Sequence, residues 1–104
     1  MSKLENQFHQ AMLDVYNNAK EYEYYATYFK RMIDQHGGVE AAKRLLAKGE
    51  IQQGLSKLWE LNLLDQSMEA LVIQKRFQPL FTSEEIVEAR RRLEELGYKT
   101  QTKP

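Results

Sequence analysis

The sequence predicts an all-α protein, and three observations lead to this class. Apolar residues recur every three or four positions along most of the chain, which is the period of a helix with one buried face. No segment shows the alternation of β-branched and polar residues that is typical of a strand. Gly37-Gly38, Gly49, Pro79 and Gly97 divide the helical pattern into short lengths. We therefore predict a compact orthogonal bundle of five or six helices.

Length and composition favour one globular domain. The chain has 104 residues, of which 42% are apolar and 29% charged, and domains typically have roughly 100 to 200 residues. We assign residues 1–98 to a single helical domain and residues 99–104 to a polar C-terminal tail. No apolar run is long enough to span a membrane and no signal peptide is recognisable, so we expect a cytoplasmic protein.

The first part of the chain predicts two helices. Ser2-Lys3-Leu4-Glu5 has the form of a capping box, in which the first and last residues bond each other's backbone, so a helix starts there. The apolar pattern then runs to His36 without glycine or proline, and one helix of more than thirty residues is an alternative. We expect a break near Tyr22–Tyr24, because such a length is unusual in a small domain. Gly37-Gly38 ends the second helix.

The middle of the chain is the densest in apolar residues and holds the only tryptophan, Trp59. A short helix over Val39 to Lys48 precedes it. The spacing then predicts a helix over Ile51–Leu61, an elbow at Asn62 to Asp65, and a helix to Lys75 capped by Ser67 or Asp65. We expect a single core formed by Trp59, Leu55, Leu58, Leu64, Leu71, Phe81, Ile86 and Leu93.

The C-terminal segment has the clearest helix signals in the sequence. Pro79 prevents a helix from continuing through Phe77 to Phe81. Thr82-Ser83-Glu84-Glu85 is a second capping box and starts the final helix. Gly97 ends that helix, and we expect Tyr98 to fold back on it as in a Schellman motif.

The distribution of charge argues against a phosphate-binding surface. Residues 1–52 carry seven basic and seven acidic side chains, and residues 53–104 carry eight of each, whereas nucleic-acid binding needs clustered positive charge. In Arg90-Arg91-Arg92 we predict a solvated helix face, with Glu88 opposite Arg92 and Arg90 opposite Glu94. A nucleic-acid-binding module of a defence or regulatory system is the alternative function, and it would use Lys43, Arg44, Lys75, Arg76 and Arg90 to Arg92.

No motif predicts catalysis, a cofactor or a metal site. The chain has no cysteine, and its two histidines, His9 and His36, lack the spacing of metal ligands. Glu5 and His9 share a predicted helix face, but two ligands are too few for zinc. We expect no catalytic, cofactor-binding or metal-binding residues and no enzymatic activity. The remaining catalytic alternative is that distant residues meet in space: Glu5, His9 and Asp14 with Asp65 or Glu69.

Tyrosines are the candidate binding residues, because tyrosine is favoured at protein interfaces. Four lie in the predicted second helix and one follows the last helix: Tyr22, Tyr24, Tyr25, Tyr28 and Tyr98. Glu21 and Glu23 are interleaved with them, which argues against a stacking platform for nucleic acid. We predict a non-catalytic protein-interaction or accessory module that binds another protein or its own copy. In the alternative interpretation the tyrosines cover the edge of the core in a monomer.

Several segments between about residue 8 and residue 98 resemble a known type of protein. They include Gly37-Gly38-Val39-Glu40-Ala41-Ala42-Lys43, Gly54-Leu55-Ser56-Lys57-Leu58-Trp59-Glu60, Leu80-Phe81-Thr82-Ser83-Glu84-Glu85-Ile86 and Leu96-Gly97-Tyr98. The chain resembles a recurring bacterial module of unknown function, found alone and beside or fused to restriction-type or phage-defence proteins. The usual glycine after its first helix is absent here, where Glu23 and Tyr24 stand. The resemblance implies an independently folding partner-binding domain and assigns no catalytic residues.

Overall fold

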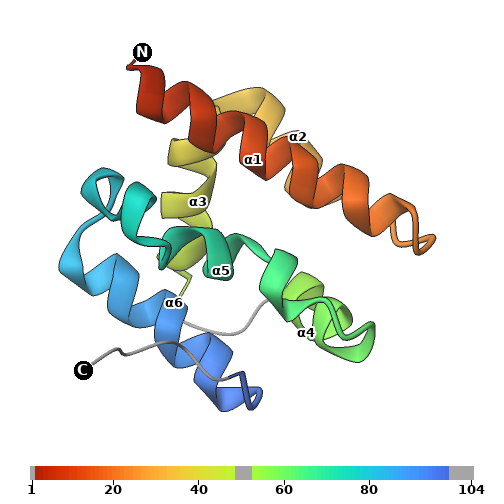
Figure 1. Ribbon diagram of the computed structural model, residues 1–104. Coiled ribbons are helices and arrows are strands. Elements are labelled where there is room, and N and C mark those ends of the chain that lie inside the picture. The colour runs from red at the N-terminus through yellow and green to blue at the C-terminus, as the bar shows by residue number, and fades with distance from the viewer. Residues whose placement is uncertain (1, 49–52, 99–104) are drawn as a thin grey trace.

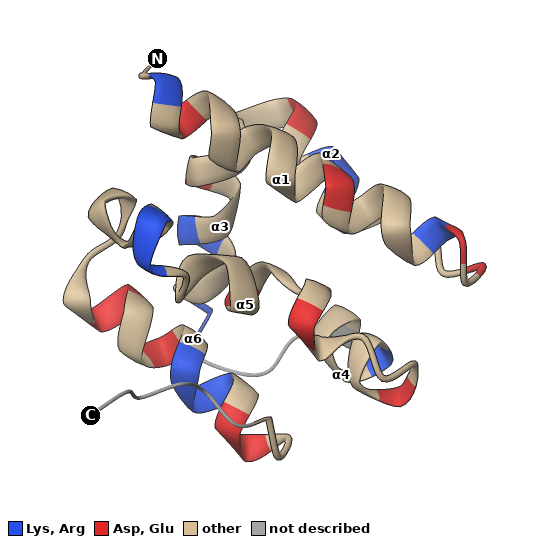
Figure 2. Ribbon diagram, viewed as in Figure 1, with Lys and Arg blue, Asp and Glu red and all other residues tan. Residues whose placement is uncertain are grey.

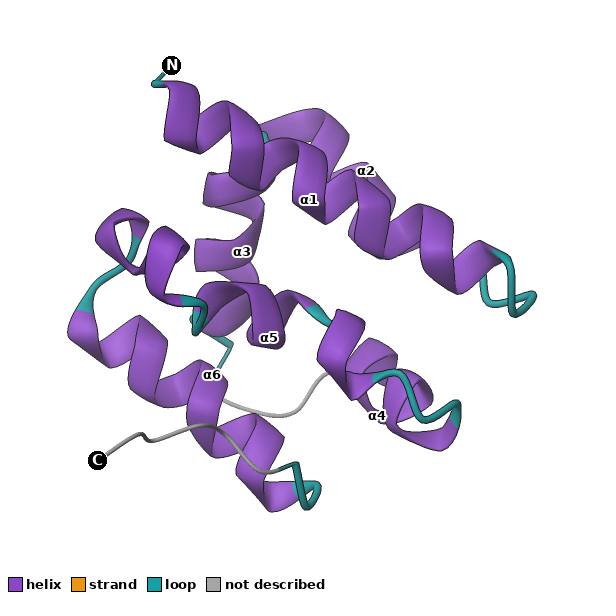
Figure 3. Ribbon diagram, in the orientation of Figure 1, coloured by secondary structure: helices purple, strands orange, loops and turns teal. Residues whose placement is uncertain are grey.

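The computed structural model describes residues 2–48 and 53–98 of the chain. These ranges contain six α-helices and two short 3-10 helices and no strand, which confirms the all-α class (Figure 3). None of these helices is long and apolar enough to cross a membrane. The elements are α1 Lys3–Lys20, α2 Thr27–His36, α3 Gly38–Leu46, α4 Gln53–Glu60, η1 Leu64–Gln66, α5 Met68–Val72, η2 Lys75–Leu80 and α6 Ser83–Glu95.

The helices form two groups joined by α3. Figure 1 shows α1 and α2 side by side, with α3 running from this pair toward α5 and α6. Helix α6 packs along α5 and touches α3, and α4 lies near the end of α1 where the chain turns into α2. This arrangement leaves the α1–α2 turn, α4 and α5 facing one another.

Both predicted capping boxes are confirmed. The Ser2 hydroxyl accepts a hydrogen bond from the Glu5 N–H at 3.0 Å, and the Glu5 carboxylate accepts one from the Ser2 N–H at 2.8 Å. Thr82 and Glu85 make the same pair of bonds at the start of α6, at 3.1 and 2.9 Å. Each box supplies partners for N–H groups that the first turn of a helix leaves unbonded.

Three helices end in the same kind of turn, the Schellman motif. In each, a residue with positive φ is followed by a residue whose N–H donates to the carbonyl five positions back. The positive-φ residues are Glu23, Asn62 and Gly97, with φ of 63°, 66° and 86°. The bonds run from Tyr24 to Ala19, from Leu63 to Leu58 and from Tyr98 to Leu93, at 3.1, 2.7 and 2.9 Å. The turn at Tyr98 and the break near Tyr22–Tyr24 are both confirmed, the break being centred on Glu23.

Some predicted boundaries were wrong. Helix α5 ends at Val72 instead of Lys75, and Ser67 caps its start by accepting from the Ala70 N–H at 3.1 Å. The segment from Phe77 to Phe81, expected to be non-helical, falls largely within η2, a short 3-10 helix of six residues that contains Pro79. Helix α3 begins at Gly38, one residue before the predicted start. The predicted end of this helix at Gly49 and the predicted start of the next helix at Ile51 lie outside the described residues.

Among the described residues the core consists of three apolar clusters instead of the single predicted one. The largest contains residues of α1, α2, α3, α5, η2 and α6, and in it the ring of Phe8 meets Phe77 and Phe81 edge-on, with each pair of centroids 5.1 Å apart. The second surrounds Leu93, and the third joins Ala19, Leu58 and Leu63. Two residues of the expected core, Leu71 and Ile86, are half-buried and pack at the edge of the largest cluster.

Trp59 is not a core residue, contrary to the prediction. Its side chain is 50% exposed, whereas Leu55 and Leu58 on the same helix are buried. Helix α4 has only eight residues, so these two leucines fill its buried stripe. Trp59 lies about 100° further around the helix than Leu58, which places it at the edge of that stripe.

Candidate functional site

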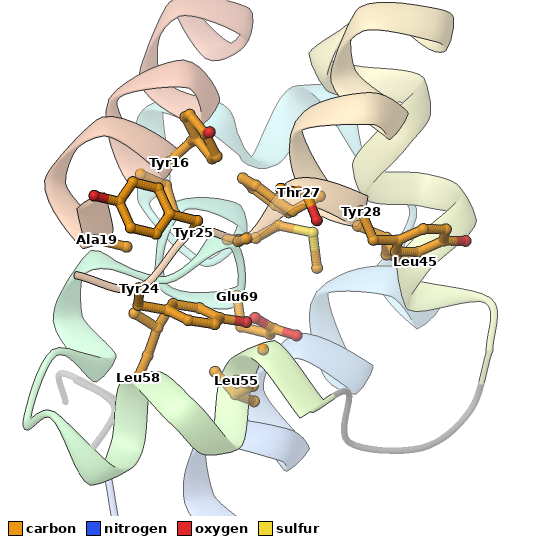
Figure 4. Close-up of a pocket in the computed structure, with 15 residues that line it drawn as sticks. Tyr16, Ala19, Tyr24, Tyr25, Thr27, Tyr28, Leu45, Leu55, Leu58 and Glu69 are labelled. Atoms are coloured by element: carbon orange, nitrogen blue, oxygen red, sulfur yellow. The ribbon is translucent and has the colours of Figure 1, made fainter. Parts of the chain in front are cut away.

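A pocket of about 390 Å³ opens between the α1–α2 turn, α3, α4 and the start of α5 (Figure 4). Most of its wall is apolar or aromatic. The aromatic residues that line it come from α1, the turn and α2, and they are Tyr16, Tyr24, Tyr25, Tyr28 and Phe29. We call this cavity the tyrosine pocket.

The turn after α1 positions Tyr24 in the wall of the pocket. Because Glu23 adopts a positive φ, the chain reverses and Tyr24 packs against the cluster of Ala19, Leu58 and Leu63. A Cβ placed on Gly54 of α4 would lie 3.4 Å from the Tyr24 hydroxyl, so the ring reaches across to that helix. Burial raises the pKa of the Tyr24 hydroxyl. Tyr24 is thus fixed in place between α1 and α4.

The other predicted tyrosines have different surroundings. Tyr22, Tyr25 and Tyr28 are exposed, and Tyr25 and Tyr28 line the tyrosine pocket. Tyr98 is separate from them, because it packs on the cluster around Leu93. The sequence placed four of the tyrosines in the second helix, but only Tyr28 belongs to α2, and the rest lie in the turn before it.

Glu69 contributes a buried carboxylate to the pocket. It belongs to the first turn of α5 and is 3% exposed, and Figure 4 shows Tyr24 extending toward it. Its Oε2 accepts a hydrogen bond from Nη1 of Arg92 at 3.2 Å. From the sequence, Glu69 was expected only as a possible partner of a histidine. The available signal was an acid in the otherwise apolar segment Met68–Val72.

Arg92 is fully buried, which corrects the predicted solvated face of Arg90-Arg91-Arg92. Its Nε donates to Glu88 at 2.7 Å, which confirms the predicted Glu88–Arg92 pair. Its Nη2 donates to the carbonyls of Leu45 and Leu46 at 3.2 and 3.1 Å. Helix α6 lies against the end of α3, where the last carbonyls have no partner within the helix, and Arg92 supplies the donors. The predicted Arg90–Glu94 pairing stays a prediction.

The two acids beside Arg92 have opposite pKa shifts. Burial raises the pKa of Glu69, against the opposing effects of its own backbone N–H and of Arg92. The hydrogen bonds from Arg91 and then Arg92 outweigh burial at Glu88 and lower its pKa to about 2. Arg91 also pairs with Glu95 at 2.7 Å, so the connected network holds three carboxylates and two guanidinium groups.

The histidines do not gather at the pocket. Nδ1 of His9 accepts a hydrogen bond from the Gly38 N–H at 2.9 Å, which joins α1 to α3. His36 lies in the last turn of α2. Neither lines the tyrosine pocket, nor do Glu5, Asp14 or Asp65. Within residues 2–48 and 53–98, no group of three histidine or acidic side chains is placed to hold a metal ion.

The basic residues proposed for nucleic-acid binding are mixed with acids. Figure 2 shows basic and acidic segments interspersed over the helices. Lys43 bonds Glu85 at 2.8 Å and Arg44 bonds Glu40 at 3.1 Å. With Arg91 and Arg92, four of the seven named cations are paired with carboxylates. Such pairing lowers the positive potential that binding to phosphates requires.

No family model, curated protein or solved structure matches the chain. The resemblance to the bacterial module therefore stays a prediction that depends on the segments quoted for it. We therefore base the proposed function on the residues that line the tyrosine pocket.

Proposed function

We propose that this chain is a non-catalytic interaction module that binds a protein partner through the tyrosine pocket. The observation that carries the proposal is the exposure of aromatic side chains around an apolar cavity. Tyr25 is 59% exposed and Tyr28 50% exposed, both at the wall of the pocket. Tyrosine rings bury a large area on binding while the hydroxyl stays hydrated, and they are enriched at interfaces for this reason.

The polar groups of the pocket support binding more than catalysis. Its carboxylate, Glu69, is bonded to Arg92, and no histidine lines the wall among the described residues. General acid–base chemistry needs a proton donor or acceptor within reach of a substrate and with a suitable pKa. A pocket with one paired acid and several apolar walls is better suited to holding a side chain of another molecule.

The test compares rim variants with a matched surface control. Tyr25→Ser and Tyr28→Ser remove exposed aromatic area at the pocket, whereas Val87→Ser changes a residue that is also 59% exposed but lies on α6. The solution mass is measured first, and the proteins encoded by the neighbouring genes are then tested as partners by affinity capture. We expect the wild type and Val87→Ser to bind a partner or self-associate, and the tyrosine variants to lose this property.

One outcome would contradict the proposed function. A strictly monomeric protein that captures none of these proteins would contradict the proposal, especially if Tyr25→Ser and Tyr28→Ser also lowered the melting temperature. In that case the tyrosines would serve only to cover the edge of the core.

A further inference from the structure

The only charged side chain that lines the tyrosine pocket, among the described residues, is an acid. It is Glu69, which is almost fully buried and which Figure 4 places beside the cavity with Tyr24 reaching toward it. A carboxylate held away from water requires compensation by hydrogen bonds or by positive charge. A ligand that brings positive charge into the pocket is therefore favoured over a neutral or acidic one.

Arg92 compensates the negative charge of Glu69 only in part. Arg92 bonds Glu69 at 3.2 Å, but it bonds Glu88 at the shorter distance of 2.7 Å and also serves two carbonyls of α3. Arg91 and Arg92 together pair with three carboxylates, those of Glu69, Glu88 and Glu95. The raised pKa of Glu69 agrees with this incomplete compensation.

The aromatic wall provides a second attraction for a cation. The face of an aromatic ring attracts an ammonium or guanidinium group within about 6 Å. One ring of the pocket already does so, because Nζ of Lys20 and Nζ of Lys30 lie 5.4 and 5.9 Å from the centroid of Tyr16. Neither lysine lines the cavity itself.

The rest of the wall suits the aliphatic part of a basic side chain. Leu55, Leu58 and Met68 add apolar side chains to the wall of the same pocket. Lysine and arginine bury their methylene stems on such surfaces while the charged end finds polar partners. The pocket thus combines apolar side chains with a carboxylate in one wall.

We propose that the tyrosine pocket receives a lysine or arginine side chain of a partner protein, with its stem against the apolar wall and its charged end at Glu69. This inference rests on the proposed function and specifies the chemistry of the bound segment. The partner segment is basic, and its contact with the pocket combines a charge pair with stacking on tyrosine rings.

The experiment is an NMR titration with two blocked pentapeptides of sequence Gly-Leu-Lys-Leu-Gly and Gly-Leu-Gln-Leu-Gly. We expect the lysine peptide to shift the methyl signals of Leu55, Leu58 and Met68 in a saturable way, at least about tenfold more tightly than the glutamine peptide. Tyr25→Leu retains apolar bulk but removes the ring, and we expect it to weaken the lysine peptide about two- to fivefold. Val87→Ser is the control and should leave the affinity unchanged.

Glu69→Gln tests the charge directly. In a folded Glu69→Gln protein we expect the preference for the lysine peptide to fall to about two- to fivefold, the part that the tyrosine rings contribute. Should this variant fail to fold, the comparison of the two peptides on the wild type still decides the question. Equal binding of both peptides to the wild type would overturn the preference for a cation but leave the proposed function standing. Binding of neither peptide at millimolar concentration would also overturn the inference that the pocket receives a basic side chain. The affinity-capture assay tests the proposed function separately.

Discussion

His9 and Gly38 mark a close crossing of α1 and α3. The Gly38 N–H donates to Nδ1 of His9 at 2.9 Å, and a Cβ on Gly38 would lie only 2.6 Å from the His9 Cα. Helices α1 and α3 can approach this closely only because Gly38 has no side chain. Gly37, just before it, has φ of 84° and ψ of 160°, a conformation that is essentially restricted to glycine. The Gly37-Gly38 pair therefore ends α2 and also allows α3 to pack closely against α1.

Gly38→Ala is expected to destabilise the fold strongly. The added methyl group would meet backbone of α1, which cannot rotate away, and overpacking of this kind costs about 1–3 kcal/mol. His9→Ala removes the hydrogen bond but leaves the crossing intact, and should cost about 1 kcal/mol. Urea unfolding followed by circular dichroism compares the two. An unchanged midpoint for Gly38→Ala would show that α1 and α3 are not packed as described.

Glu23→Gly is expected to stabilise the protein. Glu23 has φ of 63°, and a residue with a side chain in the left-handed region is disfavoured by roughly 1 kcal/mol relative to glycine. Glu21→Gly is the matched control, because Glu21 has φ of −67° and gains nothing from the freedom of glycine. The melting temperature should rise for Glu23→Gly and fall or stay level for Glu21→Gly. The reverse order would place the end of α1 elsewhere.

Arg92→Met should be far more damaging than Arg91→Met. Arg92 is fully buried, and removing one partner of a buried ion pair typically costs about 3–5 kcal/mol because the other charge is left uncompensated. Arg91 is partly exposed, and surface ion pairs add little to stability because water screens them. Equilibrium unfolding of the two variants gives the comparison. Similar small losses would indicate that Arg92 is solvated.

Because of Glu88, the free energy of unfolding should fall as the pH is lowered. Its pKa is lowered to about 2 in the folded protein, so the folded state binds fewer protons than the unfolded state between about pH 2 and the ordinary pKa of a glutamate. The stability that Glu88 contributes is present above that window and is lost as the pH falls through it. Glu69 acts in the opposite sense, because its raised pKa favours proton uptake by the folded state.

Glu88→Gln checks this prediction. The variant should be less stable at neutral pH and should lose less of its stability than the wild type between neutral pH and about pH 2. Glu84→Gln is the control, because Glu84 is an exposed acid at the start of the same helix. Parallel profiles for the wild type and Glu88→Gln, measured by chemical unfolding at each pH, would contradict the assignment.

Nucleic-acid binding is expected to be absent at low salt. Lys43, Arg44, Arg91 and Arg92 are paired with carboxylates, so little positive charge remains to release counterions from a phosphate backbone. A gel shift with single- and double-stranded DNA and RNA at low ionic strength tests this expectation. A shift that disappears as salt is raised would revive the alternative function.

Local signals in the sequence predicted the ends of the helices well. The capping boxes at Ser2 and Thr82 and the turn at Tyr98 involve residues within five positions of one another, so their chemistry is visible in the sequence. Glu23 and Asn62 adopt the same left-handed turn without glycine. There the packing of Tyr24 and Leu63 against the third cluster stabilises the turn, and that packing depends on the tertiary fold.

The candidate site was predicted only in part. The tyrosines were found from their number and type, but the pocket is assembled from the α1–α2 turn, α4 and α5, which are far apart in sequence. The burial of Arg92 depends on how α6 meets the end of α3, and a run of three arginines gives no sign of it. Trp59 was placed in the core because its spacing fits the apolar stripe, although α4 is too short and too peripheral to bury it.

The position of Arg92 has a consequence for cooperativity. Separate apolar clusters can allow parts of a protein to open independently, but α6 contributes to two of them, through Ala89 and Leu93. Detachment of α6 would withdraw Arg92 at once from Glu69 and from the last turn of α3. The amide protons of α3, α5 and α6 should therefore exchange with solvent in a single step, at the free energy of global unfolding.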